Sequence, residues 1–358
     1  MNIIFLRVVR LSKIFGVSIV ALCLLTGVVF AAQNDAERTL TIFNWPNYIG
    51  PDTLADFQKE TGIKVTELYF DDEEEVEAVI VSEPTTYDLI VSSGDSLREM
   101  KEAKLLAKID YAKIPNFKHI DPAYKNRVFD LEQEYSVPYL VGTTGVVVNK
   151  KFIDRATDSW NVLFNSKYKG RIGMLNNPYE VIGAAAKMLG YSLNVTDPAE
   201  MQVVRAKLLE QKSLVKGYYP VEDMQQLILD EKLWAAQIYS GEGMTVMDQK
   251  EDLQYFIPKE GTAMWIDSFM IPSTSLHKEE AHLFLDYILR PEVNAKIASY
   301  LWYATPNKTA EAFMDKEVLE SPEVYPSESV KSRFEFFGTI GSSSSMYSRV
   351  WRDLTLIQ

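Results

Sequence analysis

Apolar and polar residues follow one another along the first third of the chain in a pattern that predicts alternating strands and helices. Short apolar runs separated by stretches of helical periodicity place strands at 39–45, 63–70 and 87–92, and helices at 52–60, 73–82 and 95–104. Pro51 stands at the start of the first helical stretch and Gly62 just past its end, where these residues favour helix termini. The β-α-β-α-β-α order predicts a mostly parallel sheet with helices on both faces.

The pattern changes after residues 135–139, where a Gly/Thr-rich stretch at 142–145 leads into an apolar strand at 146–149. We interpret this stretch as a hinge between two α/β lobes, the first comprising 38–141 plus 267–305 and the second 142–266 plus 306–358. Later elements are expected as strands at 171–175, 233–239 and 265–272 and helices at 181–189, 198–210 and 278–289. Two such lobes place a ligand in the cleft between them and can close on it by hinge motion.

The N-terminal segment has the pattern of a secretory signal peptide. Basic residues at 7, 10 and 13 precede an apolar run at 14–30, and small residues follow at Ala31 and Ala32. We expect cleavage after Ala31, so that residues 1–31 form the signal peptide and the mature chain reaches the periplasm. An uncleaved membrane anchor is the alternative, because an apolar run of this length can span a bilayer.

Cys23, the only cysteine of the sequence, lies inside this segment and follows Leu22, whereas a lipid-acceptor cysteine usually follows a small residue. The mature chain would therefore contain no thiol for a disulfide or for cysteine catalysis. Removal of residues 1–31, which carry three basic and no acidic side chains, changes the net charge from −13 to −16. This charge argues against a nucleic-acid partner and modestly favours small cations, although solubility alone also explains it.

No catalytic or metal-binding motif stands out. The sequence lacks a Gly-x-Ser-x-Gly elbow, a phosphate-binding loop and a His-Glu-x-x-His pair. His277 and His282 are five residues apart, a poor spacing for two ligands on one helix face, and with His119 we expect them at the surface. The acidic run at 71–75 is typical of a helix start. We therefore expect neither an enzyme nor a bound metal or cofactor.

Aromatic and acidic residues gather near the ends of several predicted strands. Trp45 and Tyr48 follow the first strand, Trp265 and Asp267 lie two residues apart, and Tyr303 precedes Ala304-Thr305-Pro306-Asn307. Each aromatic residue taken alone could equally be core packing, because large aromatic side chains are usually buried. Together they suit a cation that carries apolar groups, since aromatic faces attract cations and carboxylates bind them.

Six short motifs occur in order along the mature chain: Asn44-Trp45-x-x-Tyr48, Glu60-Thr61-Gly62-Ile63-Lys64-Val65, Tyr87-Asp88-Leu89-Ile90-Val91, Ser136-Val137-Pro138-Tyr139, Trp265-Ile266-Asp267-Ser268 and Thr305-Pro306-Asn307. The ordered set resembles the bacterial periplasmic spermidine/putrescine-binding proteins, the receptors of polyamine ABC importers. The resemblance implies an α/β, two-lobed periplasmic-binding-protein fold of the type II kind, with mostly parallel sheets and hinge crossings. It also implies a monomer that delivers its ligand to an inner-membrane permease.

The same resemblance implies a set of ligand-binding positions, which in this sequence are Trp45, Tyr48, Ser93, Asp95, Glu180, Tyr239, Glu242, Trp265, Asp267 and Tyr303. We expect Asp267 to be the dominant anchor for an ammonium group, with Glu180 or Glu242 holding another from the second lobe. Three positions depart from the pattern of spermidine binders: Asn177 replaces Asp, Asp95 replaces Tyr, and the stretch around Phe337 lacks an amide. These departures leave the polyamine class in place and the preferred ligand length open.

The polyamine hypothesis competes with other functions. A periplasmic sensor could use the same fold to report polyamine occupancy to a membrane receptor, and another cationic small solute could occupy the same cleft. A secreted enzyme would need a nucleophile or metal site, and the sequence offers neither. The identity of the preferred polyamine does not follow from the residues.

Overall fold

The computed structural model describes residues 38–70, 74–154, 157–338 and 343–356. The predicted signal peptide and Cys23 lie outside the described residues, as does most of the acidic run at 71–75. None of the helices in these ranges combines the length and the apolar character needed to cross a bilayer.

The first sheet is built from the N-terminal part of the chain. Strands β1 (Thr39–Asn44), β2 (Lys64–Tyr69) and β3 (Leu89–Ser92) pair in parallel, in the order β2-β1-β3. Helices α1 (Thr53–Thr61), α2 (Glu74–Ser82) and α3 (Gly94–Glu102) alternate with them. Gly62 ends α1 with a φ of 71°, a left-handed conformation that glycine adopts without strain. The predicted order of elements is confirmed here, with ends that shift by one or two residues.

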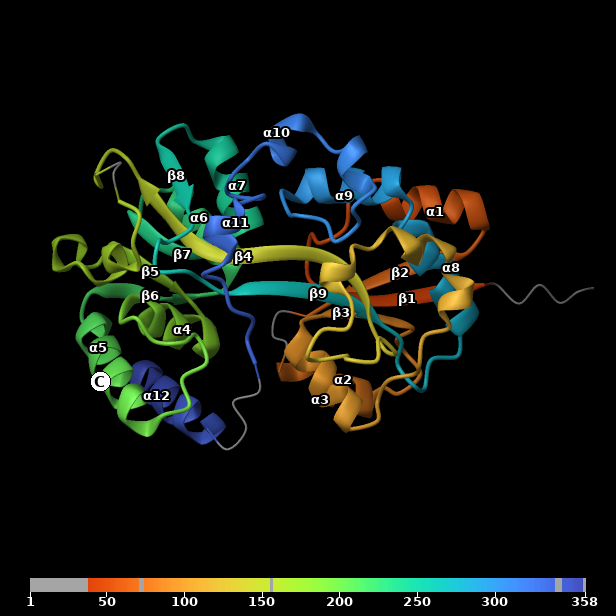
Figure 1. The fold of residues 1–358 in the computed structure, drawn as a ribbon, viewed down its shortest axis with the longest axis horizontal. Helices are drawn as coiled ribbons and strands as arrows, with labels where there is room; N and C mark the ends of the chain where they lie inside the picture. Colours follow the sequence, from red (N-terminus) through yellow and green to blue (C-terminus); the bar gives the residue numbers. More distant parts are fainter. Residues whose placement is uncertain (1–37, 71–73, 155–156, 339–342, 357–358) are drawn as a thin grey trace, which may run out of the picture. The chain divides into compact units, whose positions relative to one another are not determined.

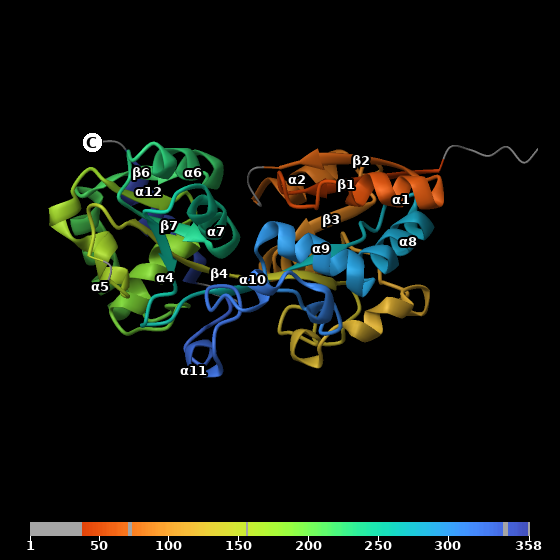
Figure 2. The same cartoon turned by 90° about the horizontal axis from the view of Figure 1, so that it is seen from above.

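Two long strands connect this sheet to the second one. Strand β4 (Val137–Asn149) pairs with β9 (Met264–Met270) along its first half and with β7 and β8 along its second half, always antiparallel. Figures 1 and 2 show β4 and β9 side by side in the middle of the molecule, with a group of helices at each end. Residues 142–145, interpreted as a hinge, are part of the continuous strand β4.

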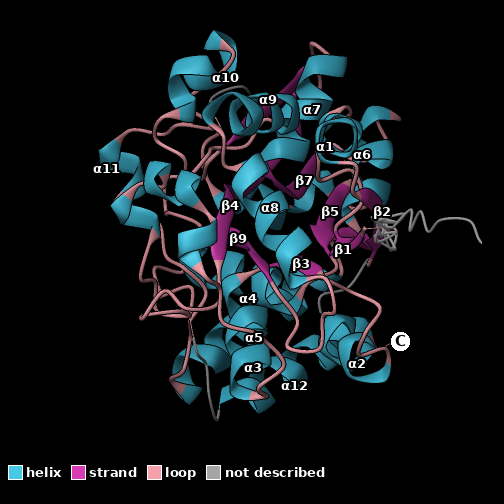
Figure 3. Cartoon of the chain, turned by 90° about the vertical axis from the view of Figure 1, so that its right-hand side faces the viewer, coloured by secondary structure: helices cyan, strands magenta, loops and turns pink. Residues whose placement is uncertain are grey.

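The second sheet combines β4 with strands β5 (Ile172–Leu175), β6 (Val215–Tyr219), β7 (Ala235–Tyr239) and β8 (Leu253–Phe256). The pairs β5–β6 and β5–β7 are parallel, so each lobe has a parallel part while the crossing strands are antiparallel. Helices α4 (Pro178–Met188), α5 (Pro198–Lys212), α6 (Val221–Leu229), α7 (Ser240–Gln249) and α12 (Ser344–Thr355) belong to this lobe. Figure 3 shows the strands at the centre with helices around them.

The chain returns to the first lobe after β9, through α8 (Lys278–Ile288) and α9 (Pro291–Leu301), and continues with the short helices α10 (Lys316–Leu319) and α11 (Glu328–Lys331). The 3-10 helices are Tyr111–Lys113, Pro115–His119, Pro122–Tyr124, Trp160–Phe164, Ser166–Tyr168 and Ala310–Phe313. The contacts of residues 307–315 do not follow the lobe boundary predicted at 306. Asn307 forms a bridge with Ile120, and the N–H of Asp315 donates to Ser299 of α9, so residues 307–315 pack on the first lobe.

Two clusters of buried apolar side chains stabilise the two lobes. One surrounds the first sheet and the crossing strands, and the other lies between β5 and helices α4, α5 and α12. The prediction of a surface position was wrong for His282, which is 5% exposed. Its ring accepts the N–H of Asp110 at 3.0 Å and lies 2.5 Å from the carbonyl oxygen of Lys278, so the buried ring has a hydrogen bond at each nitrogen.

Candidate ligand-binding site

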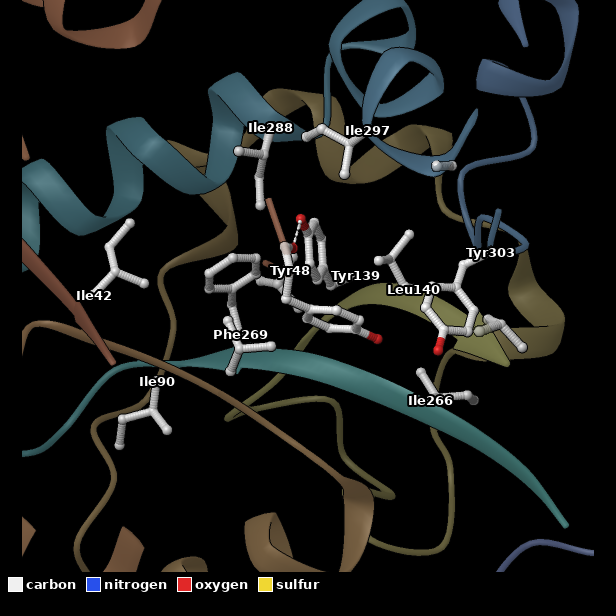
Figure 4. Close-up of a cluster of buried hydrophobic side chains, with 14 of the residues drawn as sticks. Ile42, Tyr48, Ile90, Tyr139, Leu140, Ile266, Phe269, Ile288, Ile297 and Tyr303 are labelled. Atoms are coloured by element: carbon white, nitrogen blue, oxygen red, sulfur yellow. Dashed lines mark hydrogen bonds between the residues drawn. The ribbon is translucent and has the colours of Figure 1, made fainter. Parts of the chain in front are cut away.

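Asp267 lies on β9, where that strand crosses from one lobe to the other. It pairs with Leu140 of β4, and only 8% of its surface is exposed. The hydroxyl of Tyr48 donates to its Oδ2 at 2.8 Å, and the carbonyl of Tyr48 in turn accepts the hydroxyl of Tyr139 at 2.8 Å. Figure 4 shows the rings of Tyr48, Tyr139 and Phe269 grouped above β9. Burial, with the nearby Asp267 carboxylate, raises the pKa of Tyr48, so the phenol remains a donor.

Trp265 precedes Asp267 by two residues and therefore projects from the same face of β9. Its ring packs edge-to-face on Tyr303 and Tyr239, with ring centroids 5.1 Å and 6.1 Å apart. Tyr303 in turn contacts Tyr48 edge-to-face at 5.8 Å. Four predicted aromatic residues thus form one continuous group beside the Asp267 carboxylate, in the arrangement that aromatic pairs favour.

Glu242 comes to this group from the second lobe. It lies in the first turn of α7, where the helix dipole favours a negative charge. Tyr303 follows α9 in the first lobe, where its neighbour Ala304 forms a bridge with Val141 of β4. The hydroxyl of Tyr303 donates to the Glu242 carboxylate. Burial raises the pKa of Glu242, while the Tyr303 bond acts in the opposite direction. The Tyr303–Glu242 bond therefore joins the two lobes directly.

Glu180 occupies a separate and more deeply buried position at the start of α4. It is 4% exposed, and its carboxylate accepts the hydroxyl of Thr144 at 2.8 Å. Desolvation raises the pKa of Glu180 to about 8, although the Thr144 bond lowers it. Among the described residues, neither Glu180 nor Glu242 forms an ion pair with a lysine or arginine. Glu180 therefore lies out of water and Glu242 is half-buried, and neither has a basic partner among the described residues.

Three further predicted residues lie at the ends of first-lobe strands. Trp45 directly follows β1 and packs on Phe70, with ring centroids 4.3 Å apart. Ser93 follows β3 and is half-buried at the start of α3. Asp95 belongs to the first turn of α3, and its side chain lies outside the described residues. Their strand-end positions agree with the sequence pattern, whereas contact with the aromatic group around Trp265 stays a prediction.

Two positions that depart from the spermidine-binding pattern have structural partners in this fold. Asn177 caps α4, because its side-chain oxygen accepts the N–H groups of Tyr179 and Glu180 at 3.0 and 3.1 Å. Phe337 packs edge-to-face on Tyr179 with ring centroids 6.1 Å apart. An amide cap in place of an acid removes one negative charge from the edge of the site.

The structure adds residues that the sequence did not single out. Tyr139 holds the loop carrying Tyr48, and Thr144 orients Glu180. Both lie on β4, so the long crossing strand could have directed attention to them. No group of three histidine, cysteine, aspartate or glutamate side chains in the described ranges is placed to hold a metal ion.

Comparison with known proteins agrees with this arrangement. Residues 52–326 match the model of the bacterial extracellular solute-binding proteins. The spermidine/putrescine-binding periplasmic protein of Escherichia coli (strain K12) is 31% identical over 326 residues, which cover 90% of this chain and 93% of that protein. These proteins bind solutes rather than catalyse reactions, in agreement with the expectation from the sequence.

Solved structures give the same assignment. The spermidine/putrescine ABC transporter substrate-binding protein of Streptococcus pneumoniae is 31% identical, with a TM-score of 0.80 over 89% of this chain and 99% of that chain. A protein described as a spermidine/putrescine ABC transporter from Listeria monocytogenes is 36% identical, with a TM-score of 0.84 over 90% and 100% of the two chains. The resemblance seen in the motifs is confirmed, and the chain belongs to the family of bacterial extracellular solute-binding proteins.

Proposed function

We propose that this protein binds a polyamine of the putrescine and spermidine class and delivers it to the permease of an ABC importer. The observation that carries the proposal is the joining of Asp267 and Glu242, from different lobes, by one group of aromatic rings. The names of the relatives support the same ligand class. Export to the periplasm and action as a monomer complete the proposal.

The chemistry of the group suits a flexible chain with ammonium ends. Each ammonium needs a carboxylate, and a charge-assisted hydrogen bond of this kind contributes about 1.5–3 kcal/mol net. The methylenes need apolar walls, and the rings of Trp265 and Tyr303 supply them while also attracting the cations, by about 0.5–2 kcal/mol per contact. Two contacts of each kind together contribute about 4–10 kcal/mol, so burial of the methylenes must add to them before the sum exceeds the roughly 4–15 kcal/mol cost of association.

Asp267 and Glu242 are the acids that we assign to the ammonium groups. Both accept a phenol hydroxyl of the aromatic group, which places each carboxylate at the wall where the ligand chain would lie. Glu180 is assigned a secondary role, because its carboxyl is bonded to Thr144 and a pKa of about 8 leaves it mostly neutral at pH 7. Two acids bonded to the aromatic group, with the Glu180 carboxyl bonded to Thr144 instead, favour a diamine over a longer polyamine.

Closure of the lobes follows from the positions of the two anchors. Asp267 lies on the crossing strand of the first lobe, and Glu242 lies on α7 of the second. A ligand with an ammonium at each end would pair with both only when the lobes are close, so binding would stabilise the closed form. A permease that recognises the closed form would then receive loaded protein.

A thermal-shift panel tests the ligand class directly. We expect putrescine, cadaverine and spermidine to raise the melting temperature, because a ligand that binds only the folded state stabilises it by about 2.7 kcal/mol at a hundred times its Kd. Arginine and glucose serve as a cationic and a neutral control. The absence of a shift with every amine would refute the proposal. Loss of labelled polyamine uptake on deletion of the gene distinguishes import from sensing, which would leave uptake unchanged.

A further inference from the structure

Two glycines lie directly against the aromatic rings of the candidate site. We call these rings, which belong to Tyr48, Tyr239, Trp265 and Tyr303, the aromatic wall. Gly142 of β4 is the cross-strand partner of Trp265. A methyl group built on Gly142 would lie 2.1 Å from the nearest carbon of the Trp265 ring. At Gly241, in the first turn of α7, a methyl group would lie 2.5 Å from the Tyr303 ring and 2.6 Å from the carbonyl oxygen of Leu301.

The backbone itself does not require glycine at either position. Gly142 lies in a regular strand and Gly241 in a regular helix, and neither has the positive φ found at Gly62 or Gly261. An alanine at 142 would therefore meet the Trp265 ring before any backbone strain arose, whereas an alanine at 241 would meet both the Tyr303 ring and the carbonyl oxygen of Leu301. What each glycine provides is space for a ring to lie against the main chain.

Because carbon atoms in contact are ordinarily about 3.5–4.0 Å apart, a methyl at 142 would displace the Trp265 ring by about 1.4–1.9 Å. The ring cannot move towards the main chain of β4, so it must move outwards, away from that strand. Tyr303 packs against Trp265, and the same argument at 241 moves the Tyr303 ring away from α7. Either shift is comparable with the length of one methylene in a ligand chain.

We propose that Gly142 and Gly241 are specificity-determining positions, which fix the depth of the aromatic wall and hence the length of amine that the site accepts. This inference rests on the proposed function and adds two residues that need not touch the ligand. It predicts that filling either glycine position shifts the preference towards shorter diamines. One methylene in an apolar pocket discriminates by about 10-fold or more, which sets the size of the expected shift.

Calorimetric titration of Gly142→Ala and Gly241→Ala with 1,3-diaminopropane, putrescine, cadaverine and spermidine tests the inference. We expect the ratio of Kd for cadaverine to Kd for 1,3-diaminopropane to rise about 10-fold or more in either variant. Gly183→Ala is the matched control, because its methyl would lie 2.4 Å from a flexible Leu193 methyl in the second-lobe core. That variant should leave the ratio unchanged.

A double-mutant cycle shows whether the effect passes through the ring. Trp265→Leu removes the ring carbons that overlap a methyl at 142, so Gly142→Ala should no longer alter the ratio in that background. If Gly142→Ala does not fold, Gly241→Ala paired with Tyr303→Leu provides the corresponding cycle, because Tyr303 is the ring that a methyl at 241 would meet. If neither variant folds, or if all four amines weaken by the same factor, the inference is wrong. If the wild-type chain binds none of the amines, the proposed function itself has failed.

Discussion

The replacement of Asp267 by asparagine is the sharpest test of the ligand site, because it changes charge while keeping shape. An asparagine side chain at this position would retain an oxygen that can accept the Tyr48 hydroxyl, now 2.8 Å from Oδ2. The substitution therefore keeps the Tyr48 hydrogen bond. What it removes is the negative charge that we expect an ammonium group to meet, at a position that is 8% exposed.

The expected size of the effect follows from the loss of one charge-assisted hydrogen bond. Such a bond contributes about 1.5–3 kcal/mol net, which corresponds to a Kd that is about 10- to 150-fold higher. The loss should lie towards the upper end, because little water reaches Asp267 to replace the bond. Thermal unfolding without ligand measures any separate effect of the substitution on the folded protein.

Calorimetry with putrescine and thermal unfolding without ligand measure the two effects separately. Asp88→Asn is the matched control: its carboxylate is also buried, but accepts the N–H of Thr41 at 2.9 Å and the hydroxyl of Ser275 at 2.8 Å, away from the aromatic wall. That variant should lose stability and keep its affinity. Unchanged affinity in Asp267→Asn, or an equal loss in both variants, would refute the site.

Three further substitutions test individual contacts. Tyr303→Phe should lower the melting temperature without ligand, because the half-buried Glu242 carboxylate loses its phenol donor. Circular dichroism during heating measures this melting temperature, and an unchanged value would contradict the interlobe bond. Glu180→Gln should stabilise the protein increasingly from pH 5 to pH 8. The folded carboxyl, with its pKa raised from 4.5 to about 8, keeps a proton that the unfolded chain loses, so wild-type stability falls between pH 5 and pH 8. A difference in stability between variant and wild type that does not change with pH would contradict the raised pKa of Glu180. Asn177→Ala should cost about 1 kcal/mol in urea unfolding, and Asn177→Asp almost nothing, because aspartate also caps a helix.

The order of elements in the first lobe could be predicted because each has a clear period and clear ends. Gly62 marks the end of α1, and the apolar runs mark β1 to β3. Helix α7 was missed because Gly241 and Gly243 weaken its helical signal, and packing of Gly241 against Tyr303 and of Gly243 against Tyr255 supplies the stability that propensity lacks. The antiparallel crossing strands follow from pairings between distant segments, which no local pattern contains.

The site could be predicted only in part for the same reason. Tyr48 and Asp267 are 219 positions apart in the sequence, and the pattern of residues shows only that each lies near a strand end. The resemblance to polyamine receptors brought them together with Trp265 and Tyr303, and the structure gives the contacts of that group. The neutral character of Glu180 depends on burial beside Thr144, which is a property of the fold alone.

The site is assembled from groups that make folding without a ligand less favourable. Glu180 is buried and Glu242 is half-buried, each without a basic partner among the described residues, and the Trp265 indole N–H is buried without a hydrogen bond there. Apolar side chains at these positions would give a more stable protein, because a buried charge or an unpaired donor costs free energy. An ammonium ligand would supply a counter-charge to Glu242 of the second lobe while it meets Asp267 of the first. The lobes therefore gain most from approaching each other when the ligand lies between them, which makes closure depend on occupancy.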